Sequence, residues 1–133
     1  MKIICTKFLF VACMVTCINA TGYYKIKVQN ETKRPLVITT ATNIKGLDYE
    51  MKNTININAN ANTTEEGMVS THASVKITSI KNEVKPCLMQ DEQLPLYTDV
   101  HTDSSQVRGV LVSVKPIKND KWGCKVSIKR EEE

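Results

Sequence analysis

The residues with the clearest chemical potential in this sequence lie in the segment Asp99-Val-His-Thr-Asp103. If the segment is a strand, Asp99, His101 and Asp103 project to one face, because side chains alternate between the two faces of a strand. Two carboxylates beside an imidazole could bind a divalent metal or favour the charged imidazolium. Three groups on one flat strand do not converge on a point, so an exposed polar face is the favoured interpretation. We therefore expect no metal and no cofactor, and keep this face as the alternative ligand, metal or hydrolase site.

Other catalytic arrangements are poorly represented. The sequence has only two histidines and no Gly-x-Ser-x-Gly motif, and its five glycines are isolated and form no phosphate-binding loop. A carboxylate pair such as Glu65 with Glu66 could serve a glycosidase, but adjacent acidic residues are common in loops. The sequence therefore favours a protein that is not an enzyme.

The first 20 residues have the layout of a secretory signal peptide. Lys2 and Lys7 accompany an apolar run of about 10 residues, and small residues then suit cleavage after Ala20 or, as the alternative, after Gly22. The run is too short to span a bilayer, which takes about 20 residues. A bacterial lipid-modified cysteine is a weaker interpretation of the same segment. We predict a secreted, extracellular protein in which residues 21–133 form a single domain with a short charged C-terminal tail.

Removal of this leader changes the cysteine count. Three of the five cysteines lie within it, so the mature chain keeps Cys87 and Cys124. Two cysteines in an exported domain are most simply joined in one disulfide. Closure of the loop between them would contribute about 4 kcal/mol in the loop-entropy model.

Alternation of apolar and polar residues runs through most of the mature chain. In Tyr24-Lys-Ile-Lys-Val28, for example, the apolar side chains share one face and the two lysines the other. About seven or eight such strands, separated by turn residues, predict an all-β fold: a small antiparallel β-sandwich or a Greek-key-like barrel. The predicted strands include residues 24–28, 35–40, 54–59, 73–80, 94–101, 107–115 and 121–129.

Asparagine occupies every second position from Asn56 to Asn62. Because Ile55 and Ile57 alternate with the asparagines, the stretch is interpreted as a half-buried strand that fades into a surface turn at residues 63–67. The alternative interpretation is functional: the row of asparagines forms a binding face, or a ladder that stacks between molecules.

Two glycosylation sequons, Asn30-Glu-Thr32 and Asn62-Thr-Thr64, fall at predicted strand ends. In a eukaryotic secreted protein Asn30 and Asn62 would both be acceptors, although chance also produces such triplets in a chain rich in Asn and Thr.

The composition narrows the classes of partner. The chain has 18 Lys and Arg residues against 14 Asp and Glu, and two of the lysines lie in the leader. The net positive charge of the mature chain is therefore too small to predict binding to nucleic acid. The mature chain is poor in aromatic residues, which places a membrane-active, toxin-like sandwich third. We predict a monomeric extracellular or host-directed effector that recognises an unknown protein or glycan partner without catalysis.

Overall fold

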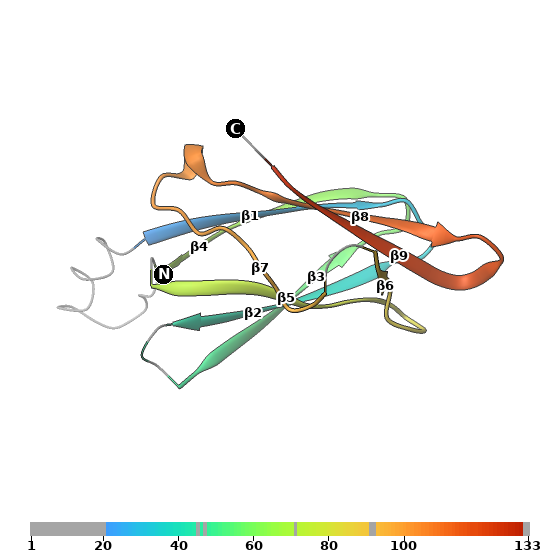
Figure 1. Cartoon of the computed structure of the whole chain (residues 1–133), viewed down its shortest axis with the longest axis horizontal. Helices are drawn as coiled ribbons and strands as arrows, with labels where there is room; N and C mark the ends of the chain where they lie inside the picture. Colours follow the sequence, from blue (N-terminus) through green and yellow to red (C-terminus); the bar gives the residue numbers. More distant parts are fainter. Residues whose placement is uncertain (1–20, 45, 47, 71, 91–92, 132–133) are drawn as a thin grey trace.

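The computed structural model describes residues 21–44, 46, 48–70, 72–90 and 93–131, and the predicted signal peptide lies outside these ranges. The described chain consists mainly of strands arranged in two layers (Figure 1). A short 3₁₀-helix, η1 (Ser104–Gln106), lies between the seventh and eighth strands. The strands are β1 (Thr21–Asn30), β2 (Leu36–Ile44), β3 (Glu50–Ile57), β4 (Asn62–Ser70), β5 (Ala73–Asn82), β6 (Leu88–Met89), β7 (Leu96–Tyr97), β8 (Val110–Ile117) and β9 (Asp120–Arg130).

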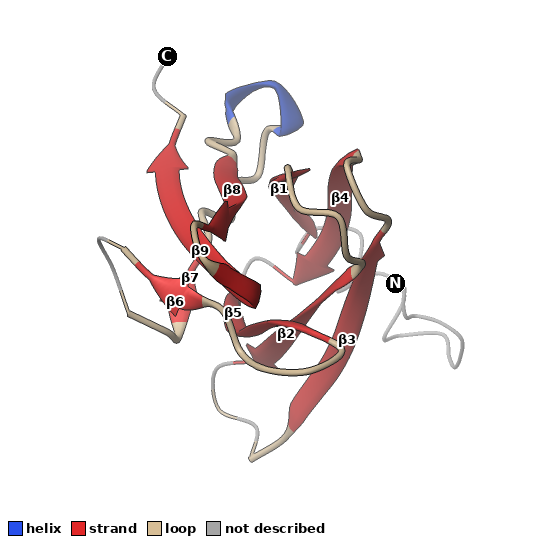
Figure 2. Ribbon diagram, turned by 90° about the vertical axis from the view of Figure 1, so that its right-hand side faces the viewer, coloured by secondary structure: helices blue, strands red, loops and turns tan. Residues whose placement is uncertain are grey.

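The two layers are a five-stranded sheet of order β4-β1-β8-β9-β6 and a four-stranded sheet of order β3-β2-β5-β7. The layers stay separate and do not close into a barrel, which confirms the predicted β-sandwich (Figure 2). Most neighbouring strands are antiparallel, but β1 runs parallel to β8 and β6 runs parallel to β9. Sequence alternation could not predict these parallel pairs, because the two-residue period is the same in both directions.

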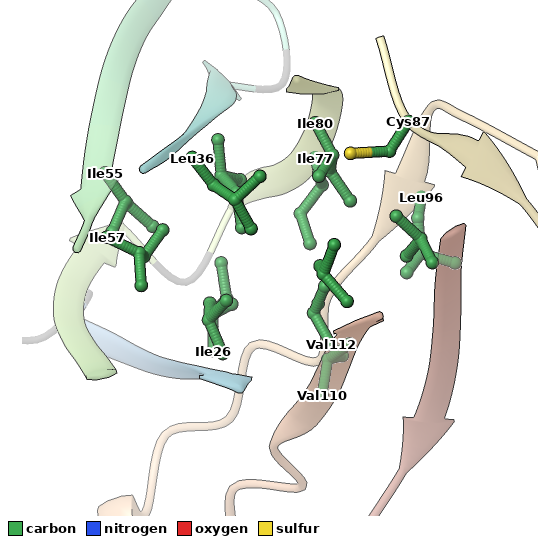
Figure 3. Close-up of a cluster of buried hydrophobic side chains, with 14 of the residues drawn as sticks. Ile26, Leu36, Ile55, Ile57, Ile77, Ile80, Cys87, Leu96, Val110 and Val112 are labelled. Carbon is green, nitrogen blue, oxygen red and sulfur yellow. The ribbon is translucent and has the colours of Figure 1, made fainter. Parts of the chain in front are cut away.

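The hydrophobic core lies between the inward faces of the two sheets and follows the alternation closely. In β1, Ile26 and Val28 are 0% and 1% exposed, whereas Lys25 and Lys27 project from the other face. Aliphatic side chains from both layers meet in this core (Figure 3). Each side chain of this size contributes about 1.5–3 kcal/mol when fully buried. Among the residues that the structure describes, twelve large side chains are essentially inaccessible to solvent: Ile26, Val28, Leu36, Ile38, Ile57, Val75, Ile77, Ile80, Val110, Val112, Val114 and Val126.

Cys87 and Cys124 form the disulfide that the cysteine count predicts. Their Cα atoms are 4.7 Å apart, and both residues belong to the hydrophobic core. Cys124 lies in β9, and Cys87 directly precedes β6. The bond therefore fastens the segment that carries β6 to the neighbouring strand of the five-stranded sheet.

Two local predictions are wrong. Residues 63–67 are not a turn but the middle of β4; β3 ends at Ile57, and the turn falls at Ala59 and Asn60, where Asn60 has a φ of 54°. The region of β4 has little β propensity, so its pairing with β1 decides its conformation. Of the predicted strand at residues 94–101, only Leu96–Tyr97 pairs regularly, with β5.

Gly67 of β4 lies directly opposite Tyr24 of β1, and the Tyr24 ring covers the glycine so closely that a Cβ atom would overlap the ring. We expect Gly67→Ala to lower the free energy of unfolding by about 1–3 kcal/mol, since overpacking forces the half-buried ring to move. Urea denaturation would measure the loss. In a Tyr24→Ala background the same substitution should cost nothing, and equal losses in both backgrounds would contradict this explanation.

Candidate binding face

The segment from Asp99 to Asp103 forms no regular strand and does not bring its three predicted groups together. The backbone of His101 makes an isolated antiparallel bridge with Tyr23, with N···O distances of 2.8 and 3.0 Å. Asp99 Oδ2 accepts a hydrogen bond from the backbone N–H of Arg108 at 3.1 Å. His101 Nδ1 accepts one from the backbone N–H of Asp103 at 3.0 Å. The side chains of Asp99 and His101 thus hydrogen-bond to the backbone of the loop in which they lie.

The third residue, Asp103, caps the short helix η1. Its Oδ1 accepts hydrogen bonds from Ser105 N at 3.0 Å and Ser105 Oγ at 2.8 Å. These hydrogen bonds from Ser105 hold the pKa of the exposed Asp103 carboxyl below its ordinary value. Capping accounts for the choice of Asp at this position.

Other candidate groupings also separate in the structure. Within the described ranges, no three His, Cys, Asp or Glu residues gather closely enough to hold a metal ion. Glu65 and Glu66 project to opposite faces of β4, because Glu65 pairs with inward-facing Ile26 and Glu66 with Lys25. The two carboxylates therefore do not share a site.

Asp120, at the start of β9, has a carboxylate that accepts hydrogen bonds from a lysine side chain and from the backbone. Its Oδ2 accepts a hydrogen bond from Lys85 Nζ at 2.8 Å, and Oδ1 accepts one from Trp122 N at 3.2 Å. The Lys85 hydrogen bond, followed by the backbone hydrogen bond from Trp122, holds the pKa of Asp120 below its ordinary value.

This depressed pKa predicts a pH dependence. A carboxylate whose folded-state pKa lies below its unfolded value stabilises the fold above about pH 4, and this contribution disappears as pH falls through the folded-state pKa. We expect Asp120→Asn to lower the free energy of unfolding at pH 7 and to have a much smaller effect at pH 2. Urea denaturation across this range would measure it. Lys85→Ala should remove much of the same pH dependence; an unchanged pH profile in both variants would contradict the assignment.

The outer face of the five-stranded sheet is the most site-like surface of the described chain. We define the outer face by the side chains that project away from the core on β1, β8 and β9. One row across the sheet contains only uncharged polar residues, because Gln29 pairs with Ser113 and Ser113 pairs with Ser127. Asn62 of β4 pairs with Gln29 and extends this row to the sheet edge.

A hollow of about 360 Å³ lies on this outer face. Ser113 and Ser127 are small and opposite each other, while longer side chains surround them. The Ser113 hydroxyl donates to Gln29 Oε1 at 3.3 Å. We refer to this feature as the polar hollow, lined by Gln29, Glu31, Gln90, Ser113, Lys115, Lys125 and Ser127.

Two of the lining residues, Lys115 and Lys125, are directly opposite each other on β8 and β9. Side chains at such positions start about 5 Å apart, and like charges there destabilise the pair. Among the described residues neither lysine has a carboxylate within ion-pair distance, whereas Lys27, on the same face of β1, contacts Glu131 at 3.2 Å. Both ammonium groups are thus free to meet an anion.

A second hollow, of about 390 Å³, lies near the disulfide, and several residues of its lining already contact one another or a neighbouring side chain. The Arg34 guanidinium carbon lies 3.1 Å from the centre of the Trp122 ring, and Arg34 also contacts Glu83 at 3.2 Å. Asn82 Nδ2 donates to the Trp122 carbonyl at 2.9 Å. Such stacking and pairing satisfy the cation and cover one ring face, so this cluster is better suited to closing the end of the sandwich.

The two sequons occupy very different environments. Asn62 is exposed on the edge strand β4, whereas Asn30 is only 1% exposed. Asn30 Nδ2 donates to the carbonyl oxygens of Arg34 at 2.8 Å and Asn58 at 3.0 Å, which uses both amide hydrogens. A glycan would replace one of these hydrogens and has no space beside a buried side chain.

The polar hollow was missed at the level of sequence because its residues come from four separate segments. Only part of it had a usable signal: Lys118-Asn119 forms a tight turn, which predicts a hairpin of β8 and β9. The register shifts between Pro116 and Ile117, so the turn alone does not place Ser113 opposite Ser127. The parallel pairing that adds Gln29 to the same row had no local signal.

The fold and this face define a small, disulfide-bonded β-sandwich with a polar hollow on one sheet. Comparison of the chain with known protein families and with curated proteins finds no match. In the described part of the chain, no helix is both long and apolar enough to cross a membrane.

Proposed function

We propose that this protein is exported and acts as a non-catalytic recognition module that binds a glycan at the polar hollow. The observation that carries the proposal is the hollow itself, where serine, glutamine and lysine side chains from separate strands surround one depression. Export is supported by the signal-like leader and is compatible with the disulfide, which persists in oxidising compartments.

The chemistry of the lining favours a sugar over a protein surface. The centres of protein interfaces are enriched in aromatic and apolar side chains, and charged residues are depleted there. The polar hollow has no aromatic or aliphatic side chain in its lining and instead presents hydroxyl, amide, ammonium and carboxylate groups. Such groups match the many hydroxyls of a carbohydrate, which need hydrogen-bond partners when they leave water.

The rigidity of the site also supports recognition. Ser113, Lys115, Lys125 and Ser127 lie on regularly paired strands whose opposite faces carry core valines. A packed sheet fixes the backbone and the short serine side chains of such a site, so these parts lose little entropy on binding.

A glycan array probed with the purified mature protein tests the proposal. Wild-type protein should bind a subset of glycans, and Ser127→Tyr should abolish this binding because a large ring fills the hollow. Thr54→Tyr places the same ring on an exposed position of the other sheet and should bind as wild type does. Absence of glycan binding by the wild type, or equal binding by Ser127→Tyr, would remove the proposal.

Export through a eukaryotic secretory pathway also leads to a prediction about glycosylation. We expect the secreted protein to carry a glycan on Asn62 and none on Asn30, since only Asn62 is exposed. Intact mass before and after enzymatic deglycosylation would count the glycans and show whether the leader ends at Ala20 or Gly22. Asn62→Gln should eliminate the mass shift on deglycosylation. A glycan found on Asn30 in folded protein would contradict the expectation.

A further inference from the structure

We propose that the polar hollow recognises an acidic glycan and that Lys115 and Lys125 together bind its sulfate or carboxylate group. This inference rests on the proposed function and adds the chemical class of the ligand. It names Lys115 and Lys125 as the specificity-determining residues and the sheet hydroxyls and amides as contacts to the neutral part of the sugar.

The placement of the two lysines carries the inference. They are cross-strand partners on the exposed side of a regular antiparallel pair, so their stems rise side by side from the sheet. An anion between two adjacent ammonium groups forms charge-assisted hydrogen bonds with both, and these bonds are stronger than neutral ones. The anion also relieves the mutual repulsion of the pair.

The surrounding charges leave this position positive. Glu31 lies on the wall of the hollow, but it forms no ion pair with either lysine. Lys129 adds a further positive charge on the same face, four residues along β9, where it lies opposite Leu111. On the other side, Lys125 pairs with Leu88 of β6, which carries no charge.

The remaining lining suits the neutral part of a sugar ring. Ser113 and Ser127 can each donate and accept hydrogen bonds, and the amides of Gln29 and Gln90 add donors and acceptors on two sides. An acidic peptide could bind the two lysines, but it has few hydroxyl groups to hydrogen-bond with these serine and glutamine side chains. The combination therefore favours a saccharide that carries an anionic substituent.

Binding should be measured by titration calorimetry and by amide chemical-shift changes, with a heparin-derived hexasaccharide and its fully desulfated, carboxyl-reduced counterpart as probes. A hyaluronan hexasaccharide distinguishes a carboxylate from a sulfate, and a hexaglutamate peptide tests for charge alone. The variant Lys115→Gln with Lys125→Gln removes the pair. The matched control, Lys52→Gln with Lys81→Gln, makes the same change in net charge at exposed positions of the other sheet.

We expect an acidic hexasaccharide to shift the amide signals of β8 and β9, and the loss of both lysines to weaken its binding at least about tenfold. The control variant should stay within about twofold of wild type, and binding should weaken with added salt. Equal weakening by both variants would show attraction to net charge and overturn the inference, as would equally tight binding of hexaglutamate.

The outcomes separate this inference from the proposed function. If only neutral sugars bind, and they shift the signals of Ser113 and Ser127, the acidic specificity fails while glycan recognition at the hollow stands. If no saccharide shifts any signal of the outer face, both fail.

Discussion

Replacing Cys87 and Cys124 together with alanine should lower the free energy of unfolding by about 4 kcal/mol without changing the fold. The two residues are 37 positions apart, and the bond removes the conformational freedom of this long loop from the unfolded chain. This loss would be a large part of the free energy of unfolding of a typical domain, which is roughly 5–15 kcal/mol.

The reason to expect a folded variant is the location of the bond. It lies at one side of the core, and the aliphatic contacts between β1, β2, β5 and β8 do not depend on it. Urea denaturation would give the free energy, and amide chemical shifts would report the fold. Reduced wild-type protein should show the same midpoint as the variant. A loss below about 1 kcal/mol would mean that the loop is already restricted in the unfolded chain.

The second large effect concerns Asn30, and we expect Asn30→Ala to lower the free energy of unfolding by about 3 kcal/mol. Asn30 Oδ1 accepts hydrogen bonds from Thr32 N at 3.0 Å and Thr32 Oγ1 at 2.6 Å, while Nδ2 donates to the carbonyls of Arg34 and Asn58. The side chain thus ties the β1–β2 turn to the end of β3. After its removal, Thr32 Oγ1 and the Arg34 carbonyl can still hydrogen-bond to each other at 3.0 Å, but Thr32 N–H and the Asn58 carbonyl lose this partner. Each such group costs about 1–3 kcal/mol when it is buried.

Two companion variants test this explanation. Asn30→Asp keeps the acceptor but loses both amide donors, so it should also be strongly destabilising. Asn62→Ala removes an exposed asparagine from the other sequon and should change stability by less than about 0.5 kcal/mol. Urea denaturation of unglycosylated protein from a bacterial host compares all three on equal terms. Similar losses for Asn30→Ala and Asn62→Ala would contradict the assigned role of the buried network.

Much of the architecture was predictable because apolar and polar residues alternate along a half-buried strand, so the local sequence indicates which side chains face the core. The alternation around Ile26 and Val28 correctly assigned one face to the core, and the count of cysteines correctly predicted the disulfide. Prediction failed where local preference and tertiary pairing disagree. The residues around Gly67 look like a turn, yet they form β4 because β1 offers hydrogen-bond partners and the Tyr24 ring fills the space that glycine leaves.

The candidate site was harder to predict. The sequence indicated a possible ligand or metal face because two carboxylates flank an imidazole at Asp99, His101 and Asp103. The strand that would align these side chains does not form. Their hydrogen bonds instead hold a loop and a short helix in place. The sequons show a similar limit, since the same three-residue pattern describes an exposed asparagine at position 62 and a buried one at position 30.

By itself, the sequence determined the all-β class, the inward faces of most strands and the identity of the disulfide partners. These properties depend on side-chain alternation and on a count of two cysteines, which are local or global features of the chain. Only the tertiary structure decided which strands are neighbours. The parallel pairing of β1 with β8 brings Gln29 beside Ser113, and the β8–β9 hairpin brings Lys115 beside Lys125. A binding face made across strands depends on register, and register arises when the whole core packs together.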